Sequence, residues 1–293
     1  GDLTISNVTI TNGNDDGGAI LNNNVLTITN SILTGNWGQS GGAIYTYRGN
    51  ATLDNVLIEN NSALGGGGIR VEFGTLNVNN SVLRNNSARG GGAIRAGQYC
   101  YSTPTVITIN NSLIFGNIAN DGTGGGVSQT CGQLSIINST IANNSSDTYG
   151  GGVAASLSIV DFVIENSTVS DNYSRLRGGG IYLDSVNATF FNSTINSNLT
   201  GGNGGALYVD CCSTVNFTNA TIANNVADDD LDNVGSGGGV YNSGSSPVFL
   251  QNTIMAGNID RSIAAVDKFP ECWGTFTSQG HNLIGNNFGC SDS

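Results

Sequence analysis

The side chains of this chain that are best suited to bind a ligand are tyrosines and arginines at one recurring position. Each directly follows an aliphatic residue that comes after a run of glycines. The position holds Tyr45, Arg70, Arg95, Ser128, Ala154, Tyr182, Tyr208 and Tyr241. We expect Tyr182, Tyr208 and Tyr241 to form an exposed ladder that could stack on sugar rings or anchor a protein partner. The ladder could also stabilise a sheet without any ligand.

A second chemical possibility is a calcium site in an acidic loop. The carboxylates of Asp228, Asp229, Asp230 and Asp232 gather in a loop that precedes one of the glycine runs. Oxygen-rich loops can hold Ca²⁺, which makes these four residues candidate metal ligands. Their spacing matches no calcium-binding loop, and a solvated acidic edge is the alternative interpretation. Ca²⁺ is the one cofactor that the sequence suggests.

Catalysis on polysaccharides would require carboxylates on one strand face, roughly 5 to 10 Å apart. The acids at strand positions, Asp54, Glu165 and Asp210, lie far apart in the chain, and no basic residue recurs beside them. The lone histidine, His281, is better explained by packing or hydrogen bonding than by catalysis. We therefore expect no catalytic residues, with a polysaccharide lyase or hydrolase as an alternative.

The six cysteines are an even number, which is typical of disulfide-bonded proteins in an oxidising compartment. Cys100 and Cys131 follow the glycine runs of adjacent repeats and could lie one above the other. Cys272 and Cys290 could close the C-terminal segment. Cys211 and Cys212 are neighbours, so that either a bridge between them or separate partners is possible.

The composition restricts the possible partners. Of 293 residues, 44 are glycine and 10% are charged, and the net charge is −12 with a single lysine, Lys268. This balance disfavours binding to nucleic acid, which requires clustered basic residues, and to an anionic membrane surface. No apolar run reaches the roughly 18 residues of a membrane-spanning helix.

These candidate residues are positioned by an internal repeat. Ten repeats, spaced 23 to 33 residues apart, align on a first asparagine, which is Asn7, Asn30, Asn55, Asn80, Asn111, Asn138, Asn166, Asn192, Asn219 or Asn252. Six residues later stands Gly13 in the first repeat and, in the others, Asn36, Asn61, Asn86, Asn117, Asn144, Asn172, Asn198, Asn225 or Asn258. We expect both series to form structural ladders, since asparagine tolerates a left-handed backbone and can hydrogen-bond to its copies above and below.

The apolar residues of each repeat predict strands. They stand four and two positions before the first asparagine and three positions after it, and mostly Thr, Ser and Asn lie between them. Alternation with period two and β-branched enrichment predicts short strands with one buried face. About 27 residues with three such strands predict one rung, meaning one turn, of a parallel β-helix. We divide the chain into a repeat array (1–258) and a divergent final rung with a disulfide-closed cap (259–293).

The repeats resemble those of chlamydial polymorphic outer-membrane proteins. The shared features are Gly-Gly-Ala-Ile, as at 91–94, and Leu-x-x-Asn or Ile-x-x-Asn in place of Phe-x-x-Asn. The whole array, with its ending at 272–276 and 280–285, is more similar still to bacterial secreted right-handed parallel β-helix repeat proteins. This resemblance implies an all-β, right-handed β-helix of about ten rungs in a secreted or cell-surface protein.

These observations favour a structural or adhesive module at the cell surface or outside the cell. The first repeat begins with a strand pattern at Leu3 and Ile5. Its strand edges could therefore pair end to end with another copy and form a filament. Surface glycans and other cell-surface proteins are the other expected partners. The alternative is a carbohydrate-binding module or a polysaccharide lyase or hydrolase.

Overall fold

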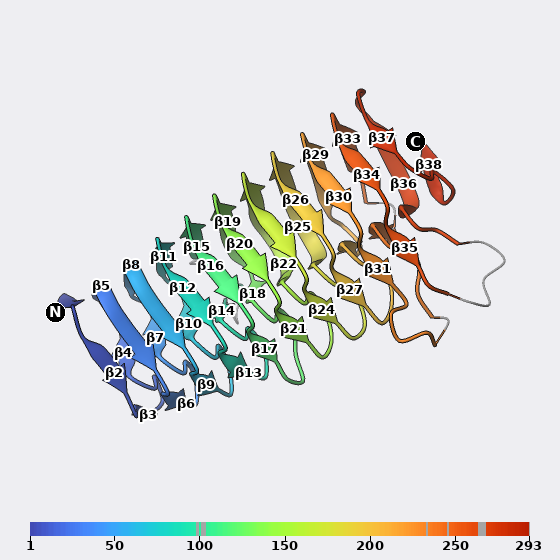
Figure 1. Cartoon of the computed structure of the whole chain (residues 1–293). Helices are drawn as coiled ribbons and strands as arrows, with labels where there is room; N and C mark the ends of the chain where they lie inside the picture. The colour runs from blue at the N-terminus through green and yellow to red at the C-terminus, as the bar shows by residue number, and fades with distance from the viewer. Residues whose placement is uncertain (98–99, 101–103, 233, 245, 263–267, 293) are drawn as a thin grey trace.

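The computed structural model describes the chain except for residues 98–99, 101–103, 233, 245, 263–267 and 293. The described residues form a right-handed parallel β-solenoid of stacked rungs, with the two termini at opposite ends (Figure 1). The predicted fold is therefore confirmed, and the elements among these residues are all strands. A search of the described residues finds no helix with the length and apolar character needed to cross a membrane.

One rung shows how the sequence pattern becomes structure. Strand β7 (Ile44–Tyr47) leads into the long strand β8 (Asn50–Glu59), which is followed by the short strand β9 (Ser62–Ala63). Alternate residues of β8 point inward, and Leu53 and Ile58 are fully buried. Because successive side chains of a strand point to opposite faces, the polar residues between them point outward.

The strands that follow the glycine runs carry the candidate binding residues, and we call them third strands. They are β4 (Ile20–Asn22), β7, β10 (Ile69–Glu72), β14 (Ile94–Ala96), β18 (Val127–Thr130), β22 (Val153–Glu165), β25 (Ile181–Phe191), β28 (Leu207–Val209), β32 (Val240–Asn242) and β36 (Cys272–Ser278). Each pairs in parallel with its copy in the next rung, from β4–β7 to β32–β36. The long strands β22 and β25 continue into the first strand of the following rung.

The remaining strands complete each rung. First strands are β1 (Leu3–Ser6), β5 (Val25–Thr34), β8, β11 (Thr75–Asn79), β15 (Thr105–Asn110), β19 (Gly132–Ile137), β29 (Thr214–Thr218) and β33 (Val248–Gln251), and β5 and β8 also include the second strand. Second strands are β2 (Thr9–Thr11), β12 (Val82–Arg84), β16 (Leu113–Phe115), β20 (Thr140–Ala142), β23 (Thr168–Ser170), β26 (Thr194–Asn196), β30 (Thr221–Ala223), β34 (Ile254–Ala256) and β37 (Leu283–Ile284). A separate ladder of short strands contains β3 (Asn14–Asp15), β6 (Trp37–Gly38), β9, β13 (Ser87–Ala88), β17 (Ile118–Ala119), β21 (Ser145–Ser146), β24 (Tyr173–Ser174), β27 (Leu199–Thr200), β31 (Val226–Ala227) and β35 (Ile259–Asp260).

The core is built from columns of apolar residues that occupy the same place in successive rungs. Leu26 pairs with Ala51, and the column continues through Leu76 toward the C-terminus. In a neighbouring column, Phe190 and Phe217 stack with their ring centroids 4.6 Å apart. Because each rung covers the apolar face of the one before it, burial is achieved by the stack and not by a single repeat.

The first asparagines form an exposed column with a left-handed backbone. Their φ angles lie between 47° and 56° in all ten rungs. Neighbouring side chains are also joined, as where the Asn55 Nδ2 donates to the Asn30 Oδ1 at 2.8 Å. The left-handed backbone and the side-chain hydrogen bonds confirm the predicted structural ladder. Asparagine suits this position because it adopts a left-handed backbone more readily than most other residues.

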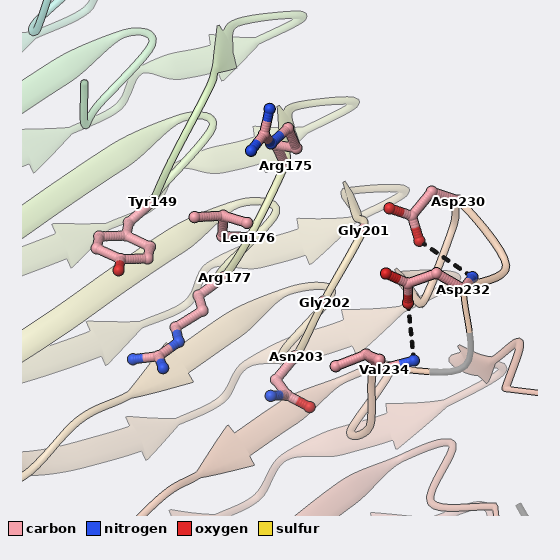
Figure 2. A pocket seen from close by; sticks show the side chains of 10 residues that line it. All are labelled: Tyr149, Arg175, Leu176, Arg177, Gly201, Gly202, Asn203, Asp230, Asp232 and Val234. Atoms are coloured by element: carbon pink, nitrogen blue, oxygen red, sulfur yellow. Dashed lines mark hydrogen bonds between the residues drawn. The ribbon is translucent and has the colours of Figure 1, made fainter. Parts of the chain in front are cut away.

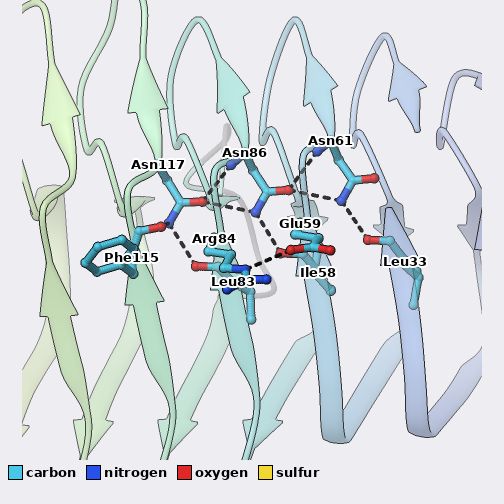
Figure 3. A network of polar contacts seen from close by, with 9 residues as sticks. All are labelled: Leu33, Ile58, Glu59, Asn61, Leu83, Arg84, Asn86, Phe115 and Asn117. Carbon is cyan, nitrogen blue, oxygen red and sulfur yellow. Dashed lines mark hydrogen bonds and ion pairs between the residues drawn. The ribbon is translucent and has the colours of Figure 1, made fainter. Parts of the chain in front are cut away.

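The second asparagines form a buried ladder of hydrogen bonds, part of which is shown in Figure 3. The Asn86 Nδ2 donates to the Asn117 Oδ1 and to the Ile58 carbonyl, both at 3.0 Å. Its Oδ1 accepts from the Nδ2 and from the backbone N–H of Asn61. The same arrangement runs from Asn36 to the end of the array, and it satisfies backbone groups that would otherwise be buried without partners.

Glu271 ends this ladder. The Asn258 Nδ2 donates to its Oε2 at 2.6 Å, and the Gly257 backbone N–H donates to its Oε1 at 3.0 Å. Each carboxamide of the ladder donates one Nδ2 hydrogen to the next rung and accepts at its Oδ1 from the rung before, so the carboxylate accepts at the donor end of the series. A charged acceptor at such a terminus is favourable for the same reason as an anion at a helix N-terminus.

The final rung and the disulfides agree with most of the sequence predictions. Bridges join Cys100 to Cys131 and Cys272 to Cys290, and they indicate a compartment outside the cytoplasm. Strand β36 continues the third-strand ladder beside β32, and β38 (Cys290–Asp292) pairs with β36 to close the end. Parts of the loops at 98–105 and 228–236, and residues 263–267 of the final rung, lie outside the described residues.

The prediction of a bridge at Cys211 and Cys212 is wrong in this structure. Both are exposed free thiols in a turn after β28. The two cysteines are adjacent in the chain, and every other cysteine is already paired.

In the first rung, Leu3 and Leu21 are exposed. The end-to-end stacking predicted from that rung stays a prediction.

Candidate ligand-binding face

The outward position of the third strands forms one column along the molecule. Strand pairing places Tyr45 beside Arg70 and Arg70 beside Arg95. Toward the other end, Tyr208 lies between Tyr182 and Tyr241. The column therefore brings together all six residues that the sequence singled out, and it extends one rung further to Trp273, which pairs with Tyr241.

The tyrosines of this column form a stack, as predicted, but the stack is not exposed. Ring centroids lie 5.6 Å apart between Tyr182 and Tyr208 and 5.2 Å apart between Tyr208 and Tyr241. Tyr149 extends the stack onto Tyr182 at 4.8 Å. Only 7% of Tyr182 and 4% of Tyr208 is accessible. The expectation of an exposed ladder is therefore wrong, because each ring covers the face of its neighbour.

An arginine from a loop completes the cover over the tyrosines. The guanidinium of Arg177 lies 4.9 Å from the ring centroid of Tyr208 and 5.5 Å from that of Tyr149. One of its nitrogens is 3.6 Å from the Asp210 carboxylate. Cation–π contacts of this kind favour a fixed position for the arginine over the rings. Arg177 and Tyr149 were not predicted, because they occupy a different recurring position, directly before the glycine runs, where they pair with each other in a parallel bridge.

Asp210 is a structural centre of this face. Its Oδ2 accepts a hydrogen bond from the Tyr182 hydroxyl at 2.9 Å. Its Oδ1 accepts from the Cys211 backbone N–H and from the Ser243 hydroxyl. Burial, together with the hydrogen bond to Asp210, raises the pKa of Tyr182 well above its usual range, so the phenol remains a donor. Both oxygens of this carboxylate therefore accept hydrogen bonds from neighbouring protein groups.

The opposite end of the column is also internally paired. The Tyr45 hydroxyl donates to the Glu72 Oε2 at 3.1 Å, and Arg70 forms a close ion pair with the same carboxylate. Burial and the Glu72 charge raise the pKa of Tyr45 to about 12. Burial and the neighbouring Arg70 lower the pKa of Arg95. Tyr45, Arg70 and Glu72 satisfy one another, so this end resembles a stabilising cluster more than an open site.

Three acids, Glu72, Asp184 and Asp210, each stand two residues after a member of the outward column. Of these, only Asp210 was among the acids considered from the sequence. Arg177 pairs with Asp210 and Arg70 with Glu72, so the expectation that no basic residue lies beside such acids is wrong for Asp210. The rungs between Glu72 and Asp184 hold other residue types at this position, so the acids do not form a continuous column.

A cavity of about 570 Å³ opens beside the tyrosine stack (Figure 2). One wall is the segment Arg175–Leu176–Arg177, and the opposite wall is the loop that carries Asp230 and Asp232. Gly201 and Gly202 lie between the walls and leave the floor without side chains. The volume is within the range of small-ligand sites, and the walls carry opposite charges.

The acidic loop brings three of its four candidate metal ligands together. Carboxylate oxygens of Asp228, Asp230 and Asp232 lie within 4.8 Å of one another, and Asp228 is buried. Asp229 instead pairs with Arg261 in the next rung. Oxygen ligands in this number suit Ca²⁺ only when further oxygens complete the shell. Calcium binding at this loop stays a prediction.

The chain matches no known protein family, and no curated protein or solved structure shows significant similarity to it. The functional argument therefore depends on the fold and on the geometry of this face.

Proposed function

We propose that this chain is a non-catalytic structural or adhesive module of a secreted or cell-surface protein. The observation that supports this most strongly is the unbroken asparagine ladder from Asn36 to Asn258, ended by Glu271. A ladder of buried hydrogen bonds along the axis favours a stiff rod that holds its side faces at fixed spacing. The disulfides fit a location where thiols are oxidised.

The pairing of charges on the candidate face supports a role without catalysis. Asp210 and Glu72, the acids nearest to the outward column, accept hydrogen bonds from tyrosines and lie against arginines. A general acid or base must keep an oxygen available to the substrate and a pKa near the working pH. These carboxylates instead hold the tyrosine and arginine side chains in place.

Incubation with polysaccharides tests this proposal directly. The purified chain is mixed with neutral and acidic polymers, with and without Ca²⁺, while viscosity and new chain ends are followed. We expect viscosity and the number of ends to remain constant, even where the polymer is retained on immobilised protein. A steady rise in chain ends that is lost in Asp210→Asn would overturn the proposal in favour of an enzyme.

Carbohydrate binding is the second candidate function, and the cavity beside the tyrosine stack favours it. The cavity combines charged walls, an open floor and the ring of Tyr149. Saccharides are bound by such mixtures of hydrogen-bonding groups and aromatic faces. Binding of this kind is compatible with an adhesive module, since adhesion requires a ligand.

A further inference from the structure

The basic wall of the cavity carries two arginines whose charged groups are available to a ligand. Arg177 is held by two tyrosine rings and the Asp210 carboxylate, yet 40% of its side chain is accessible. Its ion pair spans 3.6 Å, which is too long for a good hydrogen bond. A guanidinium has five N–H donors. Arg177, which the tyrosine rings hold in place, can therefore donate hydrogen bonds to an anion.

Arg175 adds a second guanidinium to the same wall. It is exposed, stands two residues before Arg177, and lines the same cavity. Within the part of the chain that the structure describes, no side chain forms an ion pair with it. The protein as a whole has a net charge of −12, whereas this cavity wall carries two arginines and is positively charged. This wall therefore favours an anionic group on the ligand.

The acidic wall favours hydroxyl groups. The Asp232 Oδ1 accepts from the Val234 backbone N–H at 2.8 Å, and the Asp230 Oδ1 accepts weakly from the Asp232 N–H at 3.4 Å. Ionised carboxylates have about four acceptor positions each, so both retain capacity for donors on a ligand. The same charges repel a polymer that carries an anion on every unit. A ligand that fits both walls carries a carboxylate at one place and hydroxyls at another.

The cavity is elongated along the axis of the solenoid. Its lining residues come from four successive rungs, from Tyr149 through Arg177 and Asn203 to Asp230. Neighbouring parallel strands are about 4.8 Å apart, so four rungs span roughly 14 Å. This length suits a short stretch of a chain molecule and exceeds what a single small anion would fill.

We propose that this cavity binds an acidic saccharide in which a uronic acid alternates with a neutral sugar. The uronate carboxylate pairs with Arg175, Arg177 adds positive charge at the other end of the same wall, and hydroxyls of the neighbouring sugar donate to Asp230 and Asp232. Apolar parts of the sugar rings lie against Leu176 and Val234. The inference rests on the carbohydrate-binding candidate above, for which it names the ligand class and the residues.

Isothermal titration with three oligosaccharide probes tests this assignment. The probes are a hyaluronan oligosaccharide with alternating uronate, an oligogalacturonate with a carboxylate on every sugar, and a neutral malto-oligosaccharide. We expect saturable binding of the first, weaker binding of the second, and the weakest of the third. Equal affinity for the neutral probe, or no binding of the alternating one, would overturn the inference.

Variants locate the site. Arg175→Gln should weaken binding about tenfold to hundredfold, because a charge-assisted hydrogen bond is lost. Arg84 is a matched control, since it is an exposed arginine that pairs with Glu59 away from the cavity. Arg84→Gln should leave the affinity unchanged. Equal losses in both variants would overturn the site. Arg177→Lys, which keeps the charge over the tyrosines, provides a second test and should also weaken binding.

The outcomes separate this inference from the proposed function. Depolymerisation of a probe would contradict the non-catalytic role, whatever its affinity. Absence of binding, or binding that does not depend on Arg175, would contradict the inference and leave the role of a structural module unaffected.

Discussion

A single buried carboxamide in the second asparagine column satisfies several groups at once. The Asn117 Nδ2 donates to the Leu83 carbonyl and to the Asn144 Oδ1, while its Oδ1 accepts from the backbone N–H and the Nδ2 of Asn86. Removing the side chain deprives the backbone N–H and the Nδ2 of Asn86, and the Leu83 carbonyl, of buried hydrogen bonds. The repeated asparagine is thus explained by backbone satisfaction and not by chemistry.

Asn117→Ala should therefore destabilise the chain by about 2–5 kcal/mol. Urea unfolding measures the change. The control is Asn111→Gly in the exposed column, where φ is 48° and glycine keeps the left-handed backbone. We expect that variant to lose less than about 1 kcal/mol. Equal losses at the two positions would contradict the distinction between a buried and an exposed ladder.

Glu271 predicts a specific dependence of stability on pH. Burial raises its pKa above the ordinary value of 4.5, although hydrogen bonds from Asn258 and Gly257 oppose the shift. The folded chain then holds this proton more tightly than the unfolded chain. The contribution of Glu271 to stability is therefore full below pH 4.5 and declines as the pH rises through the folded pKa.

We expect the stability of the wild type relative to Glu271→Gln to fall as the pH rises above 4.5. Urea titrations of both proteins across this range give the difference. Glu165→Gln, in a partly exposed strand position, is the control for the loss of a carboxylate from the chain. A relative stability that increases with pH would show that the ladder's hydrogen bonds outweigh burial at Glu271.

At the scale of elements, the glycine turns decide how closely the rungs can approach. A Cβ on Gly92 would lie 2.1 Å from the Gly125 carbonyl oxygen and 2.6 Å from the Ile118 nitrogen. On Gly90, in the same run, the nearest atom would be 3.7 Å away. Two glycines of one turn thus meet different constraints, because a Cβ would overlap the backbone of the next rung at Gly92 but would only touch it at Gly90.

Gly92→Ala should reduce stability by about 3 kcal/mol or prevent folding, since backbone on both sides must move. Gly90→Ala should be close to neutral. Thermal unfolding monitored by circular dichroism compares the two variants with the wild type. Similar melting temperatures for both would contradict the packing of the turns described here.

The strands were predictable from the sequence because their signal is local and repeated. Alternation around residues such as Leu53 and Ile58, together with the asparagine spacing, defines register in every rung. The burial of Tyr182 was not predicted, since it depends on the ring of Tyr149 in the preceding rung and of Tyr208 in the next. Tyr149, Arg177 and Asn203 line the cavity from one recurring position, directly before the glycine runs, but their side chains differ in type and leave no repeated residue in the sequence.

At the scale of the molecule, two disulfides hold segments that lie outside the regular repeat. Cys100 and Cys131 are 31 residues apart, and Cys272 and Cys290 are 18 apart. Closing loops of these lengths stabilises the folded state by roughly 3–4 kcal/mol per bridge in the chain-entropy model. Outside the cytoplasm these bridges persist, and they secure the side insertion and the C-terminal rung.

Replacing Cys100 and Cys131 together by serine should lower stability by about 3–4 kcal/mol under oxidising conditions. Replacing Cys211 and Cys212 together should have little effect, because both are exposed free thiols. Unfolding curves with and without reductant check both statements. A large loss in the second variant would indicate that these neighbouring cysteines are bridged in solution.

We propose that one continuous ladder of asparagines makes the array a single stiff body. Hydrogen–deuterium exchange of the asparagine backbone amides from Asn36 to Asn225 measures this, since each amide donates to the side chain of the next rung. We expect uniformly slow exchange at these amides, matching global unfolding. Rapid exchange at amides in the middle of the series would contradict it, because the array would then consist of parts that open separately.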